Sequence, residues 1–390
     1  LLAISDRWNQ MMMASKASWE KYGDPVTLDD EPLAGTGPYK IVAREQQGFV
    51  RFERVADHWR INPDFPELEI RWISEPSTKL ASFLTGESQM ASIPPDLQPQ
   101  AAAQGAKLLS SRAFGTRVWA QFHCCWPDKT TGEYPQYKDT ALEDVRVRQA
   151  LNQAVNRAEL TMAFAPQGDL MQVSHYHETF PGWNARWAQE FDAKYGYNPA
   201  AAKALLAEAG YTSSNPLKIT TRLNSCAVLA GCQDIGESLA AYWAAIGVDV
   251  NIVEIDGAAY GALGRATRSG TASLDEAVVD WVRIDNSSTH PSFALWNRQT
   301  WLGGSGPSGF ATPEIAKVVD DKIVKEMDWS KQGPALREIG DWAFDNFVTI
   351  PLWYLPAQVS VDPNVISDWQ WNGVEHGTMT HLEEIKAVLK

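Results

Sequence analysis

The alternation of helix-like and strand-like segments in the second half of this chain constrains its fold more than any other feature. The amphipathic segment Gln233–Ile246 ends at Gly247 and leads into the apolar pattern Val248–Ile255. The same order recurs where Pro334–Phe347 runs into Val348–Leu355. Helices that alternate with strands are typical of an α/β domain, in which the helices cover the faces of a sheet. We therefore expect an α/β lobe in this part of the chain.

The first third of the chain predicts a second α/β lobe. Tyr39–Glu45 and Phe49–Val55 flank the turn-forming residues 46–48, so we expect a hairpin. Glu67–Ile73 alternates apolar with charged residues and predicts a half-buried strand that places Trp72 on its apolar face. Pro76 then opens a helix.

A strand predicted over residues 115–125 has two different faces. One face is apolar and consists of Val118, Ala120, Phe122 and Cys124. The other face mixes polar and aromatic side chains, namely Arg117, Trp119, Gln121 and His123. The mixed face fits either a sheet surface under a polar loop or one wall of a ligand cleft. Both interpretations stay open at this point.

Two further helices follow from spacing and capping residues. Apolar residues recur at helical spacing through Asp144–Ala163, which predicts one continuous helix. Asn198 followed by Pro199 is a typical start of another helix, and Gly210 ends it.

Charge and composition exclude several classes of protein. The formal net charge of −14, with no run of basic residues, argues against a nucleic-acid partner. No segment approaches the roughly 20 uninterrupted apolar residues of a membrane span. Cys226 and Cys232 enclose a short loop, which fits a disulfide in an oxidising compartment or two small buried thiols elsewhere.

No established catalytic or metal motif is present in the sequence. The chain lacks the G-x-S-x-G elbow, the phosphate-binding loop and the H-E-x-x-H pair. The alternating His175 and His177 could offer ligands to a metal, but their spacing in a loop favours a surface or hydrogen-bonding role. Asp280 and Asp285 leave open the alternative of a carbohydrate-active hydrolase. We expect a protein that is not an enzyme and that uses no metal or cofactor.

Four ordered motifs carry a resemblance to a known family. They are Gly35-Thr36-Gly37-Pro38-Tyr39, the segment Arg54–Trp59, Asp144-Val145-Arg146-Val147-Arg148-Gln149-Ala150-Leu151 with its continuation to Arg157, and Asn198–Tyr211. Together they resemble the large extracytoplasmic solute-binding proteins of ABC importers, the family of dipeptide, oligopeptide and nickel binders. The resemblance covers nearly the whole chain.

The resemblance implies a two-lobed periplasmic-binding-protein fold of type II, in the large cluster with an extra domain. We expect lobe I over residues 1–125, lobe II over 126–352, and a return to lobe I over 353–390. Family members carry a longer segment before the Gly-Thr-Gly-Pro-Tyr motif, so we expect the N-terminal part to be missing here. A lipid anchor on that segment stays open.

The resemblance also suggests which residues contact a solute. The strands that cross between the lobes are expected at 121–126 and 351–356, which makes Phe122, His123, Trp353 and Tyr354 candidates. A third strand and a loop supply the others, which are Asp280, Trp281, Arg283, Asp285, Trp296 and Trp301. Peptide binders of the family carry W-x-x-D, whose carboxylate pairs with the amino terminus of the ligand. Here Ile284 stands at that spacing and Asp285 follows one residue later, which puts the ammonium-binding role in question.

The leading hypothesis is a periplasmic or extracellular binding protein, a monomer, that captures an oligopeptide-like solute between its lobes and delivers it to an ABC permease. The alternative solute is an oligosaccharide, because 17 Trp residues would suit stacking on sugar rings. The hydrolase is the alternative from another class.

Overall fold

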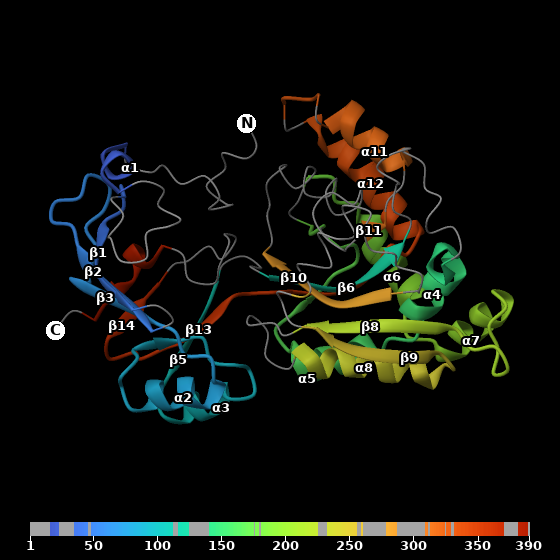
Figure 1. Cartoon of the computed structure of the whole chain (residues 1–390), viewed down its shortest axis with the longest axis horizontal. Helices are drawn as coiled ribbons and strands as arrows, with labels where there is room; N and C mark the ends of the chain where they lie inside the picture. Colours follow the sequence, from blue (N-terminus) through green and yellow to red (C-terminus); the bar gives the residue numbers. More distant parts are fainter. Residues whose placement is uncertain are drawn as a thin grey trace. The chain divides into compact units, whose positions relative to one another are not determined.

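The computed structural model describes residues 16–22, 35–45, 48–111, 116–124, 140–174, 176–178, 181–224, 232–255, 259, 278–286, 309–310, 313–323, 325–328, 331–369 and 381–388 (Figure 1). The chain divides into two compact units. Unit 1 comprises Leu1–Gly115 and Pro356–Lys390, and unit 2 comprises Thr116–Leu355. The chain thus passes between the units after Gly115 and again after Leu355, whereas the expected lobe boundaries at 125 and 352 stay a prediction.

Unit 1 contains an antiparallel sheet of the order β1-β2-β3. Its strands are β1 (Tyr39–Glu45), β2 (Phe49–Arg54) and β3 (Glu67–Arg71). The predicted hairpin is confirmed, because Tyr39 pairs with Arg54 and Glu45 with Phe49. The prediction for Trp72 is wrong: it lies beyond the end of β3, and its side chain is 71% exposed.

A second sheet of unit 1 joins strands from the early part of the chain to a strand from its late part. Its order is β4-β13-β5, so the late strand β13 lies between two early ones. The remaining elements of this unit are α1 (Lys16–Tyr22), α2 (Pro76–Leu84), β4 (Met90–Ala91), α3 (Gln98–Ala103), β5 (Lys107–Ser110), β13 (Gln358–Val361), β14 (Ile366–Asp368), the 3-10 turn η7 (Leu382–Glu384) and β15 (Lys386–Ala387).

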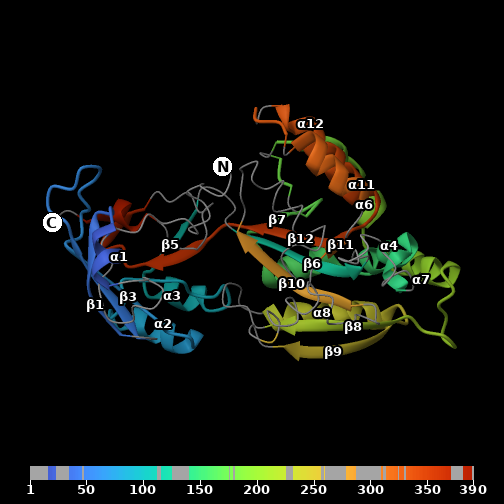
Figure 2. The same cartoon turned by 45° about the horizontal axis from the view of Figure 1, so that its top comes forward.

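Unit 2 is built on one mixed sheet of the order β7-β12-β6-β10-β8-β9, with β11 beside β6 (Figure 2). The strands are β6 (Thr116–Cys124), β7 (Asp169–Leu170), β8 (Lys218–Asn224), β9 (Asp249–Ile255), β10 (Val278–Asn286), β11 (Gly309–Phe310) and β12 (Thr349–Leu355). The pairs β8–β9 and β8–β10 are parallel, whereas β6 pairs antiparallel with both β10 and β12. The central strand β6 therefore has two antiparallel neighbours.

Helices surround this sheet. They are η4 (Ala141–Glu143), α4 (Val145–Gln153), α5 (Arg157–Phe164), α6 (Ala185–Tyr195), α7 (Pro199–Glu208), α8 (Cys232–Ala245), α11 (Pro313–Val318), the π-helical turn η5 (Val319–Ile323) and α12 (Gly333–Asp345). Both views place α8 along β8 and β9 and α11 beside α12. In the described part of the chain, no helix has the length and apolarity needed to cross a bilayer.

The helix starting at Asn198 is confirmed, and the prediction of one helix over Asp144–Ala163 is wrong. The Asn198 side chain accepts a hydrogen bond from the Ala201 amide at 3.0 Å, as an N-cap does. The segment 144–163 instead forms α4 and α5, separated by residues 154–156. Asn156 adopts a non-helical conformation and accepts from the Glu159 amide, so it caps α5.

The core of unit 2 is one large apolar cluster between the sheet and its helices. Phe122 and Trp353 are both fully buried in it, on neighbouring strands. It also includes Trp187 from α6 and Trp243 from α8. The sheet that carries most candidate residues is therefore rigidly supported by packing.

Candidate functional site

The three neighbouring strands β12, β6 and β10 bring together most of the predicted site residues. Val279 on β10 lies opposite Phe122 on β6, and Asp280 lies opposite Gln121. On the other side of β6, Tyr354 lies opposite Arg117. Segments separated by more than 150 residues in the sequence thus meet at the centre of one sheet.

The two predicted faces of β6 are confirmed. Val118, Ala120 and Phe122 lie in the apolar core. Residues of the opposite face are buried as well, with Arg117 at 2%, Trp119 at 1% and Gln121 at 0% exposure; we call these three the polar face of β6. Because burial removes these polar groups from water, their hydrogen-bonding partners decide what this face can bind.

Hydrogen bonding on the polar face is partly internal. The Trp119 indole Nε1 donates to Gln121 Oε1 at 3.0 Å, and the guanidinium carbon of Arg117 lies 5.8 Å from the centre of the Trp119 ring. Gln121 Nε2 is buried and has no hydrogen-bond partner among the described residues. The polar face therefore holds a cation, an aromatic plane and an amide donor in fixed positions.

A β-bulge in β10 determines which of its residues lie opposite the polar face. Asp280 pairs with Gln121, and Arg283 pairs with Trp119. From one pair to the next, β10 advances by three residues and β6 by two, so β10 has one extra residue there. Without that residue, Ile284 would lie opposite Arg117. With it, Asp285 takes that position. The extra residue and the displacement of Asp285 from the W-x-x-D spacing are thus of the same size, one residue.

A second bulge lies on the other side of Trp119, in β12. Pro351 pairs with Trp119, and Trp353 pairs with Val118, so Leu352 is the extra residue. As a result, Trp353 lies opposite the apolar face of β6 and Tyr354 lies opposite Arg117. The burial agrees, because Trp353 belongs to the apolar core and its indole donates to the Thr161 hydroxyl at 2.7 Å.

Together the two bulges align a row of ionisable residues across four strands. Asp169 on β7 pairs with Tyr354, Tyr354 pairs with Arg117, and Arg117 pairs with Asp285. We call these four residues the terminal row, because it lies one residue from Thr116 and Leu355, where both connections leave unit 2. A positive group between two acidic positions can recognise a ligand that carries both charges.

His177 contacts the same row from the segment after β7. Its ring packs edge-on against that of Tyr354, with 5.0 Å between the ring centres, and its Nε2 lies 3.7 Å from Asp169 Oδ2. The Tyr354 hydroxyl donates to the Tyr176 carbonyl. Burial raises the pKa of Tyr354, against the opposing effect of Arg117, so Tyr354 stays neutral and donates.

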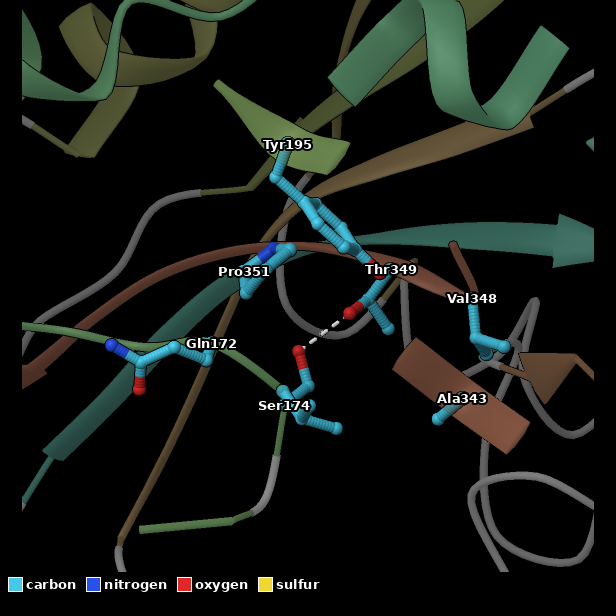
Figure 3. Close-up of a pocket in the computed structure, with 8 residues that line it drawn as sticks. Gln172, Ser174, Tyr195, Ala343, Val348, Thr349 and Pro351 are labelled. Atoms are coloured by element: carbon cyan, nitrogen blue, oxygen red, sulfur yellow. Dashed lines mark hydrogen bonds between the residues drawn. The ribbon is translucent and has the colours of Figure 1, made fainter. Parts of the chain in front are cut away.

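A small pocket lies beside the polar face (Figure 3). Thr349 and Pro351, which pair with Gln121 and Trp119, line it together with Ser174 and Tyr195. The Ser174 and Thr349 hydroxyls bond to each other at 2.6 Å, as the dashed line in Figure 3 marks. No charged side chain lines this pocket, so the charged groups of the terminal row are the better anchor for a charged solute.

The predicted site residues fall into three groups. Phe122, Trp353 and Tyr354 have at most 1% of their surface exposed, so their role in binding stays a prediction. His123, Asp280, Trp281, Arg283 and Asp285 are placed by their backbone in the β6–β10 ladder. Trp296 and Trp301 lie outside the described residues.

Sequence reasoning did not select Arg117 or Asp169 as candidates. Arg117 had been placed on the correct face of β6, and only its register with Tyr354 and Asp285 distinguishes it. Asp169 belongs to a two-residue strand that has no periodicity to detect. In the described part of the chain, His, Cys, Asp and Glu residues form no group of three that could hold a metal ion.

The sequence of this chain matches a known protein family and several of its members. The family model described as "Bacterial extracellular solute-binding proteins, family 5 Middle" matches residues 4–303. The glutathione-binding protein GsiB of Pectobacterium atrosepticum is 27% identical over 254 residues, covering 63% of this chain and 43% of that protein. The dipeptide-binding protein of Escherichia coli K12 is 24% identical over 240 residues, covering 62% and 42%. The chain therefore matches less than half the length of these two relatives.

A solved structure shares the fold. The ABC transporter-associated periplasmic binding protein DppA from Helicobacter pylori, in complex with the peptide STSA, superposes with a TM-score of 0.71 at 17% identity. The superposition covers 97% of this chain and 69% of the other. The predicted periplasmic-binding-protein fold of mixed α/β type is thereby confirmed.

Proposed function

The chain belongs to family 5 of the bacterial extracellular solute-binding proteins, and from this premise we propose that it captures a short peptide by its charged ends and delivers it to an ABC permease. Members of this family bind solutes outside the cytoplasm. The chain is thus an extracytoplasmic binding protein and not an enzyme, in agreement with the sequence-based expectation.

The terminal row is the observation that carries this proposal. A free peptide has an ammonium group and a carboxylate. Arg117 is positioned to attract the carboxylate, and the acidic positions Asp169 and Asp285 to attract the ammonium group. Because the β10 bulge sets Asp285 opposite Arg117, the displaced aspartate retains the role that the W-x-x-D motif implies.

Aromatic residues give less support to an oligosaccharide. Trp187, Trp243, Trp353 and Trp369 are core residues, whereas the exposed Trp19, Trp59 and Trp72 belong to unit 1 and not to the sheet that carries the terminal row. The names of the two relatives point in the same direction, since one binds dipeptides and the other glutathione. Delivery to a permease rests on the ABC-transporter association of the similar DppA structure.

The test is a calorimetric and thermal-shift screen of the purified protein against dipeptides to pentapeptides. The same peptides with an acetylated amino end or an amidated carboxyl end serve as probes of each charge. We expect binding of the free peptides, and weakening by blocking either end, because each charge-assisted contact contributes about 1.5–3 kcal/mol, or roughly 10- to 150-fold in Kd.

Variants then show which residue binds which end of the peptide. Asp285→Asn should weaken the binding of free peptides. It should leave the binding of acetylated peptides unchanged, since these no longer carry the ammonium group. Asp249→Asn, on the exposed edge strand β9, is the matched control. It should change neither the Kd of the free peptides nor that of the acetylated ones. Binding of oligosaccharides but no peptide would refute the proposal, as would equal binding of free and doubly blocked peptides.

A further inference from the structure

The buried arginine at the start of α5 lies in an unusual environment. Arg157 is 6% exposed, and among the described residues no carboxylate forms an ion pair with it. Its hydrogen bonds go to oxygens of neutral groups instead. Nε donates to Pro351 O at 2.8 Å, Nη1 to Asn152 O at 3.1 Å and Tyr195 O at 2.9 Å, and Nη2 to Asn152 Oδ1 at 2.7 Å.

Two helix ends explain how a cation is stable there. Asn152 lies in the last turn of α4, and Tyr195 is the last residue of α6. The carbonyls at a helix C-terminus lack partners within the helix and carry partial negative charge. Arg157 satisfies one carbonyl from each helix, so the two helix ends take the place of a counter-ion. The break between α4 and α5 makes this possible, because it puts Arg157 at the first position of a new helix.

The remaining bond of Arg157 reaches the bulge of β12. Pro351 is the last residue before the irregularity that makes Leu352 the extra residue. Neighbouring bonds act on the same stretch of backbone. The side-chain amide of Asn152 donates to Thr349 O at 3.0 Å, and the backbone amide of Met171 donates to Leu352 O at 3.0 Å. The carbonyls of Thr349, Pro351 and Leu352, at and just before the irregularity, are therefore held from outside β12.

Side chains of α5 hold the end of the bulge as well. The Thr161 hydroxyl donates to the Arg157 carbonyl at 2.7 Å and accepts from the Trp353 indole. Pro351 and Thr349 also line the pocket of Figure 3. The α4–α5 segment is thus bonded to β12 on both sides of the extra residue.

We propose that Arg157 is a positioning residue for solute binding, which holds the β12 bulge in the register that sets Tyr354 opposite Arg117. If the bulge were lost, β12 would shift by one residue beyond Pro351, and Trp353 would take the position opposite Arg117. This would exchange a neutral hydrogen-bond donor in the terminal row for a core indole. The effect on solute affinity rests on the proposed function; the effect on the register does not.

Arg148 supplies a matched control. It is a second buried arginine of the same motif, and it bonds the helix-end oxygens Asn346 O, Leu142 O and Glu143 O. None of these three belongs to β12. Replacing either arginine by Lys keeps the charge and loses the forked geometry. A general packing defect would affect both variants equally, whereas the positioning role belongs to Arg157.

The experiment compares Arg157→Lys and Arg148→Lys by amide hydrogen exchange and by binding of the free peptide trialanine. We expect exchange in residues 349–355 to accelerate about tenfold or more in Arg157→Lys alone, because the amides there depend on local opening. The Kd for trialanine should rise about tenfold in Arg157→Lys and stay within about twofold in Arg148→Lys. Arg157→Gln, whose shorter side chain cannot replace all four hydrogen bonds of the guanidinium, takes the place of Arg157→Lys if that variant is not recovered folded.

The outcomes separate the two proposals. Equal acceleration of residues 349–355 in the two Lys variants, or none in either, would overturn the positioning role. Selective acceleration with an unchanged Kd would overturn its link to binding. A wild-type protein that binds neither trialanine nor any other free peptide refutes the proposed function, and the exchange data still decide whether Arg157 sets the register.

Discussion

Replacing Trp353 by Phe separates a role in the core from a role in solute binding. Trp353 is fully buried in the apolar cluster of unit 2, and its indole nitrogen donates to the Thr161 hydroxyl at 2.7 Å. The Phe side chain removes that donor and leaves a void where the second ring had been. The lost hydrogen bond costs about 1 kcal/mol, and the void adds about 1–2 kcal/mol.

We therefore expect Trp353→Phe to lower the free energy of unfolding by about 2–3 kcal/mol. In a unit of this size that corresponds to a decrease in Tm of roughly 4–12 °C. Urea-induced unfolding, followed by fluorescence and by circular dichroism, measures the change, and thermal shift with peptides measures the affinity. Trp72→Phe is the control, because its side chain is 71% exposed and the substitution should cost less than about 0.5 kcal/mol.

A double-mutant cycle with Thr161→Val tests the hydrogen bond itself. The two substitutions remove opposite ends of one bond, so we expect a coupling free energy of about 1 kcal/mol. The reasoning is refuted if Trp353→Phe is no more destabilising than Trp72→Phe. A variant of unchanged stability and weakened peptide binding would instead support the sequence-based prediction that Trp353 contacts the solute.

Two further substitutions test the electrostatics and the packing of unit 2. The hydrogen bond from the neighbouring Arg146 side chain lowers the pKa of Asp144, which also caps α4. A lowered pKa stabilises the fold above the usual carboxyl pKa, and this stability is lost as pH falls through the folded-state value. Asp144→Asn should therefore cost about 0.5–1 kcal/mol at pH 7, and this penalty should decrease as pH falls below the usual carboxyl pKa. Gly340→Ala should cost about 1–3 kcal/mol, because the new Cβ would lie 2.4 Å from Trp187 Cη2.

Urea-induced unfolding measures the stability of both variants, Asp144→Asn and Gly340→Ala. A penalty for Asp144→Asn that is the same at pH 3 as at pH 7 would contradict the electrostatic explanation. Gly37→Ala is the control for the glycine, since a Cβ on Gly37 meets nothing within 4 Å. Equal stability of the two alanine variants would contradict the close packing of Trp187 against α12.

Local signals in the sequence were sufficient for much of the secondary structure. The hairpin of β1 and β2 and the cap of α7 depend on a few adjacent residues, and both are confirmed. The break between α4 and α5 was missed for a physical reason. Ala154 and Val155 continue the apolar spacing and are buried, so periodicity is the same whether the helix continues or stops. Only Asn156, a good capping residue, distinguishes the two cases.

The candidate site was predictable at the level of strands but not of side chains. The sequence indicated that the segments around residues 121, 280 and 353 would meet, and they form adjacent strands. Which residues share a face depends on register, and a single extra residue reverses the alternation. The role assigned to Trp353 by position alone therefore competes with its burial in the core, whereas Arg117 becomes notable only once its partners are known.

The bulges themselves explain why that information is absent from local sequence. Nothing in the composition of β12 distinguishes a regular strand from a bulged one, apart from Pro351, which has no amide to donate. Its carbonyl is instead bonded by Arg157, a residue 194 positions earlier in the chain. The same argument applies to Asp285, because its displacement from the expected spacing equals the one extra residue of the β10 bulge, which the local sequence does not show. A one-residue displacement from a binding motif therefore predicts either a lost function or a compensating bulge, and only the strand register decides between them.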